Sequence, residues 1–504
     1  MSNDKWIHYF VDGVIHEAEW TEYDRNYLVN RVIALIGMNE IAADDYSRPT
    51  PLPALVTCKN HLVEMAVSNG AIADSFSARD QLGATLMDLI TPSPTKVNQT
   101  FHQYAETDAQ KATDYFYQLS CQNDYIKTEA IAKNIRFFSK QKYGTYEITI
   151  NLSKPEKDPK EIALARTMKT SKYPRTMLAP ENEGYQGRVD YPSRVNHRII
   201  WFPMGAETWG FQYSPYAYYQ EHCIFLNQKV VPMKITQQTF ERLLGIIDRF
   251  PHYFVGSNAD LPIVGGSILS HDHYQGGLDV FPMSQATVDW LQPDTVSASV
   301  QLGIVNWPMS VIRLSSSSKE ELVACATSVL AYWDEYSDLS QDIVAHAEDG
   351  TRHHTITPIA RQRDGVYELD LVLRDNHTTA TYPDGLFHPH PQYHHIKKEN
   401  IGLIEVMGLA ILPPRLKDEL AEVKKTLIGE NSQVVSAHQD WVEDLKAQVD
   451  GPLSEEQADA LIEQSLGEIF EQILENAGVF KRTEAGQNAF RAFVSRWQAD
   501  RKGA

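Results

Sequence analysis

Two histidines and a glutamine alternate along one short stretch of the chain, at His271, His273 and Gln275. On an extended backbone, side chains at every second position point to the same face, so these three groups should face one spot. Glycine pairs at 265–266 and 276–277 flank them, and glycine lets backbone N–H groups approach an anion closely. Imidazole, amide and backbone donors that converge in this way suit the chemistry of a phosphoryl group.

The same stretch carries a resemblance to a known family. Residues 260–277 resemble the signature of the class II galactose-1-phosphate uridylyltransferases, a branch of the histidine-triad superfamily. Four further blocks spread this resemblance over most of the chain, at 123–134, 148–159, 306–313 and 394–408. The resemblance implies transfer of UMP from UDP-glucose to galactose 1-phosphate, giving UDP-galactose and glucose 1-phosphate, in the Leloir route of galactose metabolism.

A nucleotidyl group moves between two phosphate acceptors most easily in two displacements, through a covalent enzyme intermediate. A neutral imidazole has a free lone pair near pH 7 and forms a reactive phosphoramidate. The resemblance places the uridylylated residue at His273, with His271 orienting or polarising it. Gln275 can donate an amide hydrogen bond to the non-bridging oxygens, and such a donor contributes ~2.7–4 kcal/mol by analogy with oxyanion holes. Further backbone or hydroxyl donors are expected from Gly265, Gly266 and Ser267.

Residues outside the motif are candidates for contacts with the substrates. Asn258 resembles an asparagine with which the better-known branch of the family contacts the nucleotide phosphate, although a turn residue is the plainer explanation. The aromatic stretch 209–216 lies where that branch has its uridine-binding strand and loop, and aromatic faces can stack on a base. The candidates in this stretch are Gln212, Tyr213 and Tyr216, with core packing as the alternative. Lys397 and Lys398 can meet the phosphate of the hexose, with a solvated position as the alternative.

The spacing of cysteine and histidine gives no metal site that is local in the sequence. The four cysteines form no Cys-x-x-Cys pair, whereas the better-known branch often carries zinc on such a pair and two histidines. Zinc accepts nitrogen and carboxylate oxygen, so ligands could still assemble in space from His197, Glu221, His222, His252, His353 and His354. We predict no metal in the catalytic step and no cofactor.

The net charge of −20 in 504 residues argues against nucleic acid or an anionic membrane as a partner, since both require a basic face. No apolar run approaches the ~20 residues of a spanning helix, and the N-terminal residues lack a signal-peptide pattern. Reduced cysteines fit a cytosol. We therefore expect a cytoplasmic protein whose partners are UDP-glucose and galactose 1-phosphate.

The wider sequence predicts an α+β fold, and the resemblance implies a histidine-triad-like one: largely antiparallel sheets in two related halves, a helical N-terminal region and C-terminal helices. Alternating residues predict strands near 146–152, 198–202, 223–226, 311–314 and 365–373, and helical spacing predicts helices at 237–250, 319–336 and 454–476. We divide the chain into a mainly helical region (1–140), a first half with the catalytic motif (141–315), a second, degenerate half (316–415) and C-terminal helices (416–504).

Two features bear on duplication and assembly. A second His-x-His-x-Gln at 388–392 is consistent with a repeated unit, and an irregular loop explains it equally well. The helix at 454–476, whose Ser454 and Gln457 can form a capping box, covers the sheet in the simplest explanation. A homodimer contact is the alternative.

Other interpretations stay open at this point. A hydrolase of the same superfamily would release the nucleotide to water, and UTP could replace UDP-glucose as the donor. A metal-binding module without catalysis would use the histidines His388, His390, His394 and His395. His390 could also be the nucleophile, although its motif lacks the double glycines. The sequence leaves the hexose preference and the number of subunits undecided.

Overall fold

The computed structural model describes residues 4–41, 46–153, 161, 171–266 and 268–503. These residues form two compact units. The first unit takes its residues from 1–129, 154–217 and 223–230, and the second takes its residues from 130–153, 218–222 and 231–504. The motif at 271–275 lies in the second unit.

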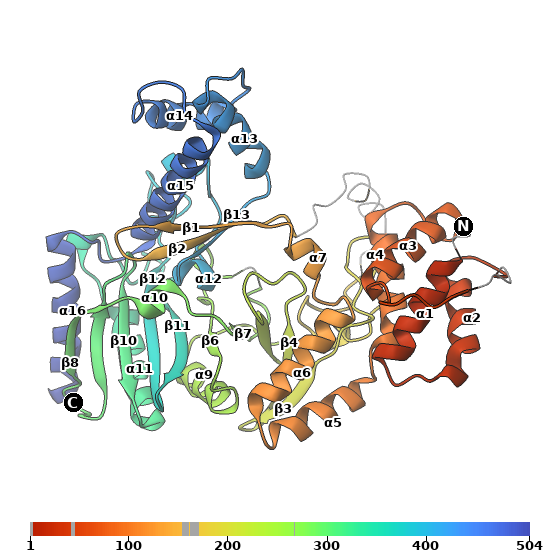
Figure 1. The fold of residues 1–504 in the computed structure, drawn as a ribbon. Coiled ribbons are helices and arrows are strands. Elements are labelled where there is room, and N and C mark those ends of the chain that lie inside the picture. Colours follow the sequence, from red (N-terminus) through yellow and green to blue (C-terminus); the bar gives the residue numbers. More distant parts are fainter. Residues whose placement is uncertain (1–3, 42–45, 154–160, 162–170, 267, 504) are drawn as a thin grey trace. The chain divides into compact units, whose positions relative to one another are not determined.

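The N-terminal part of the first unit is helical (Figure 1). Four helices pack their apolar faces together: α1 (Lys5–Glu17), α2 (Arg25–Leu35), α3 (Leu55–Ser68) and α4 (Phe76–Met87). Their shared core includes Phe10, Val32, Leu62 and Leu86. The helices that follow are α5 (Pro94–Ala105), α6 (Ala109–Gln122) and α7 (Thr128–Ile131).

Three consecutive antiparallel strands complete the first unit. They are β3 (Ile200–Met204), β4 (Glu207–Tyr213) and β5 (Cys223–Asn227). Phe211 of β4 contacts Phe101 of α5 and Phe116 of α6, with ring centroids 5.9 and 5.4 Å apart. These rings join the helices to the sheet.

The second unit is built on seven strands in the order β7-β6-β11-β12-β10-β9-β8, each antiparallel to its neighbours. The strands are β6 (Phe254–Gly256), β7 (His273–Gly277), β8 (Val288–Pro293), β9 (Gln301–Val305), β10 (Val311–Ser316), β11 (His354–Arg363) and β12 (Val366–Asp375). Two helices, α9 (Gln237–Arg249) and α11 (Lys319–Glu335), pack against each other and against β11. The apolar residues Phe240, Leu243 and Ile247 of α9 are buried there.

The strands β11 and β12 form a hairpin with a two-residue turn. Asp364 and Gly365 in this turn have φ values of 51° and 79°, and positive φ at both positions is what the tightest hairpin turns require. The register pairs His354 with Asp375 at the open end of the hairpin. The turn therefore sets which side chains meet along the full length of both strands.

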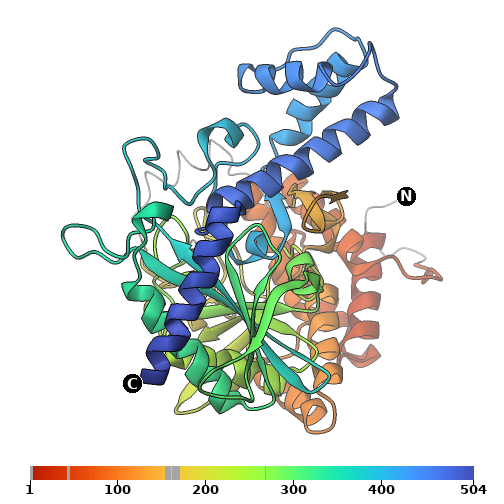
Figure 2. The same ribbon diagram turned by 90° about the vertical axis from the view of Figure 1, so that its left-hand side faces the viewer.

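A smaller sheet and the C-terminal helices make up the rest of the second unit. Strand β2 (Thr145–Ile150) lies between β1 (Ile135–Lys140), which is antiparallel, and β13 (Leu409–Leu412), which is parallel. The long helix α15 (Glu455–Ala477) packs on β1 and β2. The remaining helices of the unit are α10 (Pro282–Gln285), α12 (Leu403–Val406), α13 (Leu416–Leu427), α14 (Gln439–Lys446) and α16 (Glu484–Gly503). Figure 2 shows α16 across the front of the view.

The observed architecture confirms the predicted α+β class with antiparallel sheets, a helical N-terminal region and C-terminal helices. The predicted capping box is present, because the N–H of Gln457 donates to the hydroxyl of Ser454 at 3.2 Å. One strand, β1, lies where the sequence pattern is mainly helical, and its pairing with β2 accounts for the difference. Within the described ranges, no helix combines the length and apolarity needed to cross a membrane.

Candidate functional site

The predicted catalytic motif lies on β7, where strand geometry sorts its side chains between two faces. His273 and Gln275 share one face, and Tyr274 points the other way. Arg242 of α9 lies on this other side, with Nη1 3.5 Å from the hydroxyl of Tyr274 and 3.1 Å from Oδ2 of Asp272. The alternation expected from the sequence is therefore present, with Asp272 and Tyr274 in structural contacts.

The ring of His273 is buried and its tautomer is fixed. Nδ1 lies 2.7 Å from the carbonyl oxygen of His271, and a carbonyl can only accept, so Nδ1 carries the hydrogen and Nε2 keeps a lone pair. The pKa of His273 is lowered to about 4, mainly by burial; the hydrogen bond to the carbonyl of His271 opposes this shift, and the nearby ring of His271 adds a smaller lowering. The imidazole is therefore neutral at pH 7, as a nucleophile must be.

His271, predicted to orient or polarise His273, contacts that ring through its main chain. It precedes the strand, its ring is fully buried, and the contact that orients His273 comes from its main-chain carbonyl. The first histidine of the motif therefore fixes the second through the backbone.

A residue that sequence reasoning did not single out as catalytic, His222, holds the amide of Gln275. Nε2 of His222 lies 3.2 Å from Oε1 of Gln275. Burial lowers the pKa of His222 to about 4, although the bond to Gln275 opposes this shift, so the ring is neutral at pH 7. Because His222 occupies the amide oxygen, the NH₂ group of Gln275 is the part left to donate to a ligand. The signal in the sequence that could have indicated His222 is its position directly before the strand predicted at 223–226.

The segment that carries His222 is anchored on both sides. Glu221 has a φ of 54° and its Oε2 accepts a hydrogen bond from the hydroxyl of Tyr253. Tyr219 donates from its hydroxyl to the carbonyl of Gly276 at 3.2 Å. Gly277 has a φ of 152°, and a Cβ at this position would lie 2.7 Å from the carbonyl oxygen of Glu221. The second glycine pair therefore allows β7 and the His222 segment to approach each other.

The first glycine pair closes a turn beside Asn258. Oδ1 of Asn258 accepts from the N–H of Leu403 at 2.9 Å, and a Cβ on Gly266 would lie 2.8 Å from Nδ2 of Asn258. A Cβ on Gly265 would lie 2.5 Å from the carbonyl oxygens of Ala259 and Leu261. Close approach of the backbone therefore explains both glycines. Ser267, another predicted donor, lies outside the described residues.

The three candidates of the aromatic stretch 209–216 belong to the first unit, on β4 and just after it. Gln212 is buried, and its Oε1 lies 3.1 Å from Nε2 of His197. Tyr216 is half-buried, and burial raises its pKa to about 12. Tyr213 is fully buried, with its hydroxyl donating to the carbonyl of Thr113 at 3.1 Å. These contacts fit the core-packing alternative for Tyr213, and its contact with a base stays a prediction.

The two lysines proposed for the hexose phosphate have different surroundings. Lys397 is buried, and its ammonium group donates to Oε1 of Glu405 and to the carbonyl of Ile411, both at 3.1 Å. In this structure the charge of Lys397 is matched by Glu405, and its contact with the hexose phosphate stays a prediction. Lys398 is exposed and lies 3.5 Å from Asp384.

The second His-x-His-x-Gln forms loop and a short 3₁₀ turn, Pro391–Tyr393, in place of a strand. Nε2 of His390 faces the carbonyl of Leu386 at 3.0 Å, and its ring stacks on Tyr382. Nε2 of His394 faces the carbonyl of Pro389 at 2.8 Å. These contacts hold the loop together, as expected if the second motif is an irregular loop.

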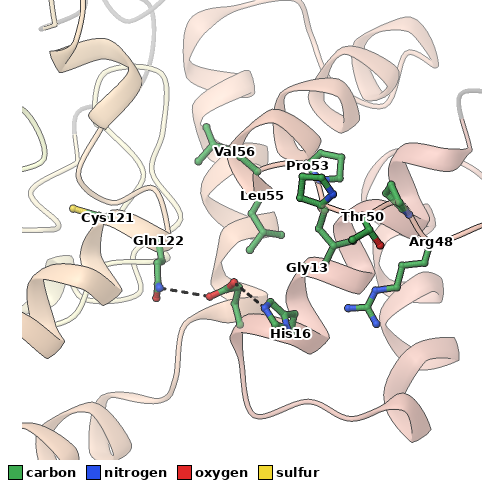
Figure 3. Close-up of a pocket in the computed structure, with 14 residues that line it drawn as sticks. Gly13, His16, Arg48, Thr50, Pro53, Leu55, Val56, Cys121 and Gln122 are labelled. Carbon is green, nitrogen blue, oxygen red and sulfur yellow. Dashed lines mark hydrogen bonds and ion pairs between the residues drawn. The ribbon is translucent and has the colours of Figure 1, made fainter.

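A separate cavity of about 850 Å³ lies in the first unit (Figure 3). Its walls come from α1, the start of α3, the end of α6 and the proline-rich segment before α3. It contains none of the predicted site residues. The arrangement capable of phosphoryl chemistry is the one around β7.

Comparisons with known proteins identify the family of the chain. Residues 18–232 match the family described as galactose-1-phosphate uridyl transferase, N-terminal domain, and residues 246–443 match its C-terminal domain. The chain is 55% identical over 486 residues to the galactose-1-phosphate uridylyltransferase of Ligilactobacillus salivarius (strain UCC118). The aligned residues cover 96% of this chain and 97% of that protein.

Two further comparisons complete the picture. The protein of the same name from Streptococcus pneumoniae (strain CGSP14) is 55% identical over 485 residues, with 96% of this chain and 97% of that protein covered. Among solved structures, yeast Ap4A phosphorylase aligns with 59% of this chain and 89% of its own, at 12% identity and a TM-score of 0.34.

Proposed function

The chain belongs to the galactose-1-phosphate uridylyltransferase family and is a transferase, and on this basis we propose that it moves UMP from UDP-glucose to galactose 1-phosphate through a uridylylated His273. In the first step, Nε2 of His273 attacks the α-phosphorus and glucose 1-phosphate leaves. In the second step, a phosphate oxygen of galactose 1-phosphate attacks the same phosphorus, the P–N bond breaks, and UDP-galactose forms.

The observation that carries this proposal is the state of the His273 ring. Its Nδ1 is held by the carbonyl of His271 at 2.7 Å, and burial keeps the ring neutral. The lone pair on Nε2 is therefore available without a separate general base. When Nε2 bonds to phosphorus the ring becomes cationic, and the carbonyl of His271 then stabilises the hydrogen on Nδ1 by a charge-assisted bond.

Gln275 supplies a donor for the charge that develops on the phosphoryl oxygens. It lies on the same face of β7 as His273, and His222 holds its amide oxygen at 3.2 Å. This contact directs the NH₂ group toward a ligand, so that little reorganisation is needed during the reaction. We assign His222 the part of a positioning residue for Gln275.

Other predicted residues keep their assignments as part of the proposal. Backbone groups at Gly265 and Gly266, with Nδ2 of Asn258 beside them, are candidates for contacts with the nucleotide phosphates. Gln212, Tyr213 and Tyr216 are candidates for contacts with the nucleotide, and Lys397 and Lys398 are candidates for the hexose phosphate.

The test is to trap the intermediate. The parent enzyme is incubated with UDP-glucose labelled in uracil, separated from free nucleotide, and measured by intact-protein and peptide mass spectrometry. We expect a mass increase of one UMP on the peptide that contains His273. Adding galactose 1-phosphate should remove the label and release UDP-galactose.

Two variants make this test specific. His273→Asn should carry no label, while His390→Asn, which alters the second motif, should be labelled as fully as the parent. Label that persists in His273→Asn would refute the assignment. A label that is discharged by water as fast as by galactose 1-phosphate would indicate a hydrolase instead, and labelling by UTP in place of UDP-glucose would indicate a different donor.

A further inference from the structure

A small cavity in the second unit lies beside the end of β11 that leads into the hairpin turn. Its volume is about 200 Å³, and its wall is formed by the segments 251–254 and 279–285, by the last residues of β11 and by Met407. Among the described residues of this wall, none belongs to the motif at 271–275 and none is His222. The cavity is therefore a separate site, and uridylyl transfer as proposed above does not use it.

Two arginines of β11, Arg361 and Arg363, bring guanidinium groups to this cavity. They are two positions apart on the strand, so both side chains point to the same face of the sheet. Arg361 is 7% exposed; its Nη1 donates to Oδ2 of Asp370 at 2.7 Å, and its Nε lies 2.6 Å from Oε2 of Glu368. Within the part of the chain that the structure describes, Nη2 of Arg361 has no hydrogen-bond partner. A buried donor left in this way costs free energy, so Nη2 is suited to an acceptor that a ligand supplies.

Positive charge exceeds negative charge in the group of ion pairs around Arg361. Three guanidinium groups share two carboxylates here: Arg313, Arg361 and Arg363 with Glu368 and Asp370. Burial lowers the pKa of Arg363, and the neighbouring charge of Arg361 lowers it further. An anion in the cavity would offset this repulsion between like charges.

The remaining polar groups of the wall include further donors. Nη2 of Arg363 donates to the carbonyl of Ser284 at 2.7 Å, which holds the guanidinium group beside α10. Gln285 adds an amide and His252 adds an imidazole. Asp279 is an acidic residue of the same wall, and burial raises the pKa of its carboxyl group, which disfavours the charged form. The wall therefore combines several donors with one acidic group.

We propose that this cavity binds one small oxyanion, either inorganic phosphate or the phosphate group of a small monoester, between Arg361 and Arg363. A guanidinium group matches two oxygens of a phosphate with two parallel N–H···O bonds. The volume of about 200 Å³ is below the roughly 300–1,000 Å³ of sites for larger ligands, which favours a small anion over a nucleotide. The simpler alternative is a purely structural network of ion pairs, but that network leaves Nη2 of Arg361 without an acceptor.

Equilibrium dialysis of the full chain against radiolabelled inorganic phosphate tests the proposal. Saturating UMP is present in every arm, because it occupies the groups that hold the nucleotide phosphate in the proposed catalytic site. We expect about one phosphate bound per chain, and we expect excess sulfate to displace it. Displacement by glycerol 3-phosphate as effective as that by unlabelled phosphate would identify the phosphate group of a monoester as the ligand, and its failure to compete would identify the free ion.

Variants assign the bound phosphate to the two arginines. Arg363→Gln should weaken binding roughly 10–150-fold, the range expected for the loss of a hydrogen bond from a charged group. Arg361→Lys keeps a positive charge beside Asp370 but has no Nη2 group, so it should also weaken binding. Arg491→Gln is the matched control, because it removes the same charge from an exposed position on α16 outside the cavity, and it should bind like the parent.

Asp279→Asn should change the affinity in the opposite direction. The substitution removes a negative charge from the wall of the cavity and should therefore strengthen phosphate binding. A residue with a merely structural role would not produce tighter binding when it is replaced.

Three outcomes would overturn the proposal. The first is a parent chain that binds no phosphate when UMP is present. The second is unchanged affinity in folded Arg361→Lys and Arg363→Gln variants, and the third is weaker binding by folded Asp279→Asn. Uridylyl transfer measured on the same samples should be retained in Arg363→Gln, so failure of this proposal can be told apart from failure of the catalytic one.

Discussion

His222→Phe tests whether the contact between His222 and Gln275 contributes to catalysis. Phenylalanine keeps a ring beside Tyr218 and Tyr219, whose rings lie 5.5 and 4.5 Å from that of His222. The substitution removes the N–H that donates to Oε1 of Gln275. The amide of Gln275 then loses its fixed orientation, while the nucleophile His273 keeps its own bond to the carbonyl of His271.

The expected size of the effect follows from the hydrogen bond. Leaving one buried polar partner unsatisfied costs about 1–3 kcal/mol, which corresponds to roughly a 5- to 150-fold lower kcat at about 1.36 kcal/mol per factor of ten. Removing the donor itself in Gln275→Ala should cost more, about 10²–10³-fold in kcat. KM for UDP-glucose should change little in both variants, since the donor acts on charge that develops in the transition state.

Steady-state kinetics on a double-mutant cycle provide the decisive assay. If His222 acts only through Gln275, adding His222→Phe to Gln275→Ala should lower kcat hardly further. Tyr219→Phe is the control, because it removes a hydrogen bond from the same segment to the carbonyl of Gly276 and leaves Gln275 held. Fully additive losses in the double variant, or a change confined to KM, would refute this reasoning.

Three further outcomes are expected. Burial lowers the pKa of His273 and His222 to about 4, so kcat/KM should fall only as the pH approaches 4. The ordinary pKa of histidine is 6.5, so the unfolded chain takes up protons before the folded chain does as the pH falls. Chemical denaturation should therefore show that the free energy of unfolding decreases as the pH is lowered from about 6.5 to 4. Asp370→Asn should lower the free energy of unfolding by about 3–5 kcal/mol, because Arg313 and Arg361 both bond to this buried carboxylate at 2.7 Å. Asp248→Asn is the control: Asp248 forms a half-exposed ion pair with Lys319, so its loss should cost at most about 1 kcal/mol. Gly277→Ala should lower kcat because its Cβ would lie 2.7 Å from the carbonyl of Glu221 and displace the segment that carries His222; wild-type kinetics in this variant would contradict that packing role.

Local features of the site could be predicted from the sequence because they depend on neighbours along the chain. The alternation that places His273 and Gln275 on one face is a property of any strand. The opposite placement of Tyr274, next to Arg242, follows from the same rule. The cap of α15 at Ser454 depends on a residue only three positions away.

Other features depend on residues that only the fold brings together. The contact between His222 and Gln275 joins residues 53 positions apart. The pair of Lys397 and Glu405 forms where the fold buries Lys397 beside the partly buried Glu405. Tyr213 carries the same aromatic ring whether it stacks on a base or packs in a core, so the sequence could not show its contact with Thr113. The contact between His354 and Asp375 likewise depends on the pairing of β11 with β12.

The two-residue turn at Asp364 and Gly365 has influence far from its own position. Ten paired residues separate it from the open end of the hairpin, a span of roughly 33 Å at about 3.3 Å per residue. An insertion of one residue at this tip would move every side chain of one strand to the opposite face. Asp370 would then be carried away from Arg313, and Asp375 from His354, so the hairpin tip is where a change in length should be tolerated least.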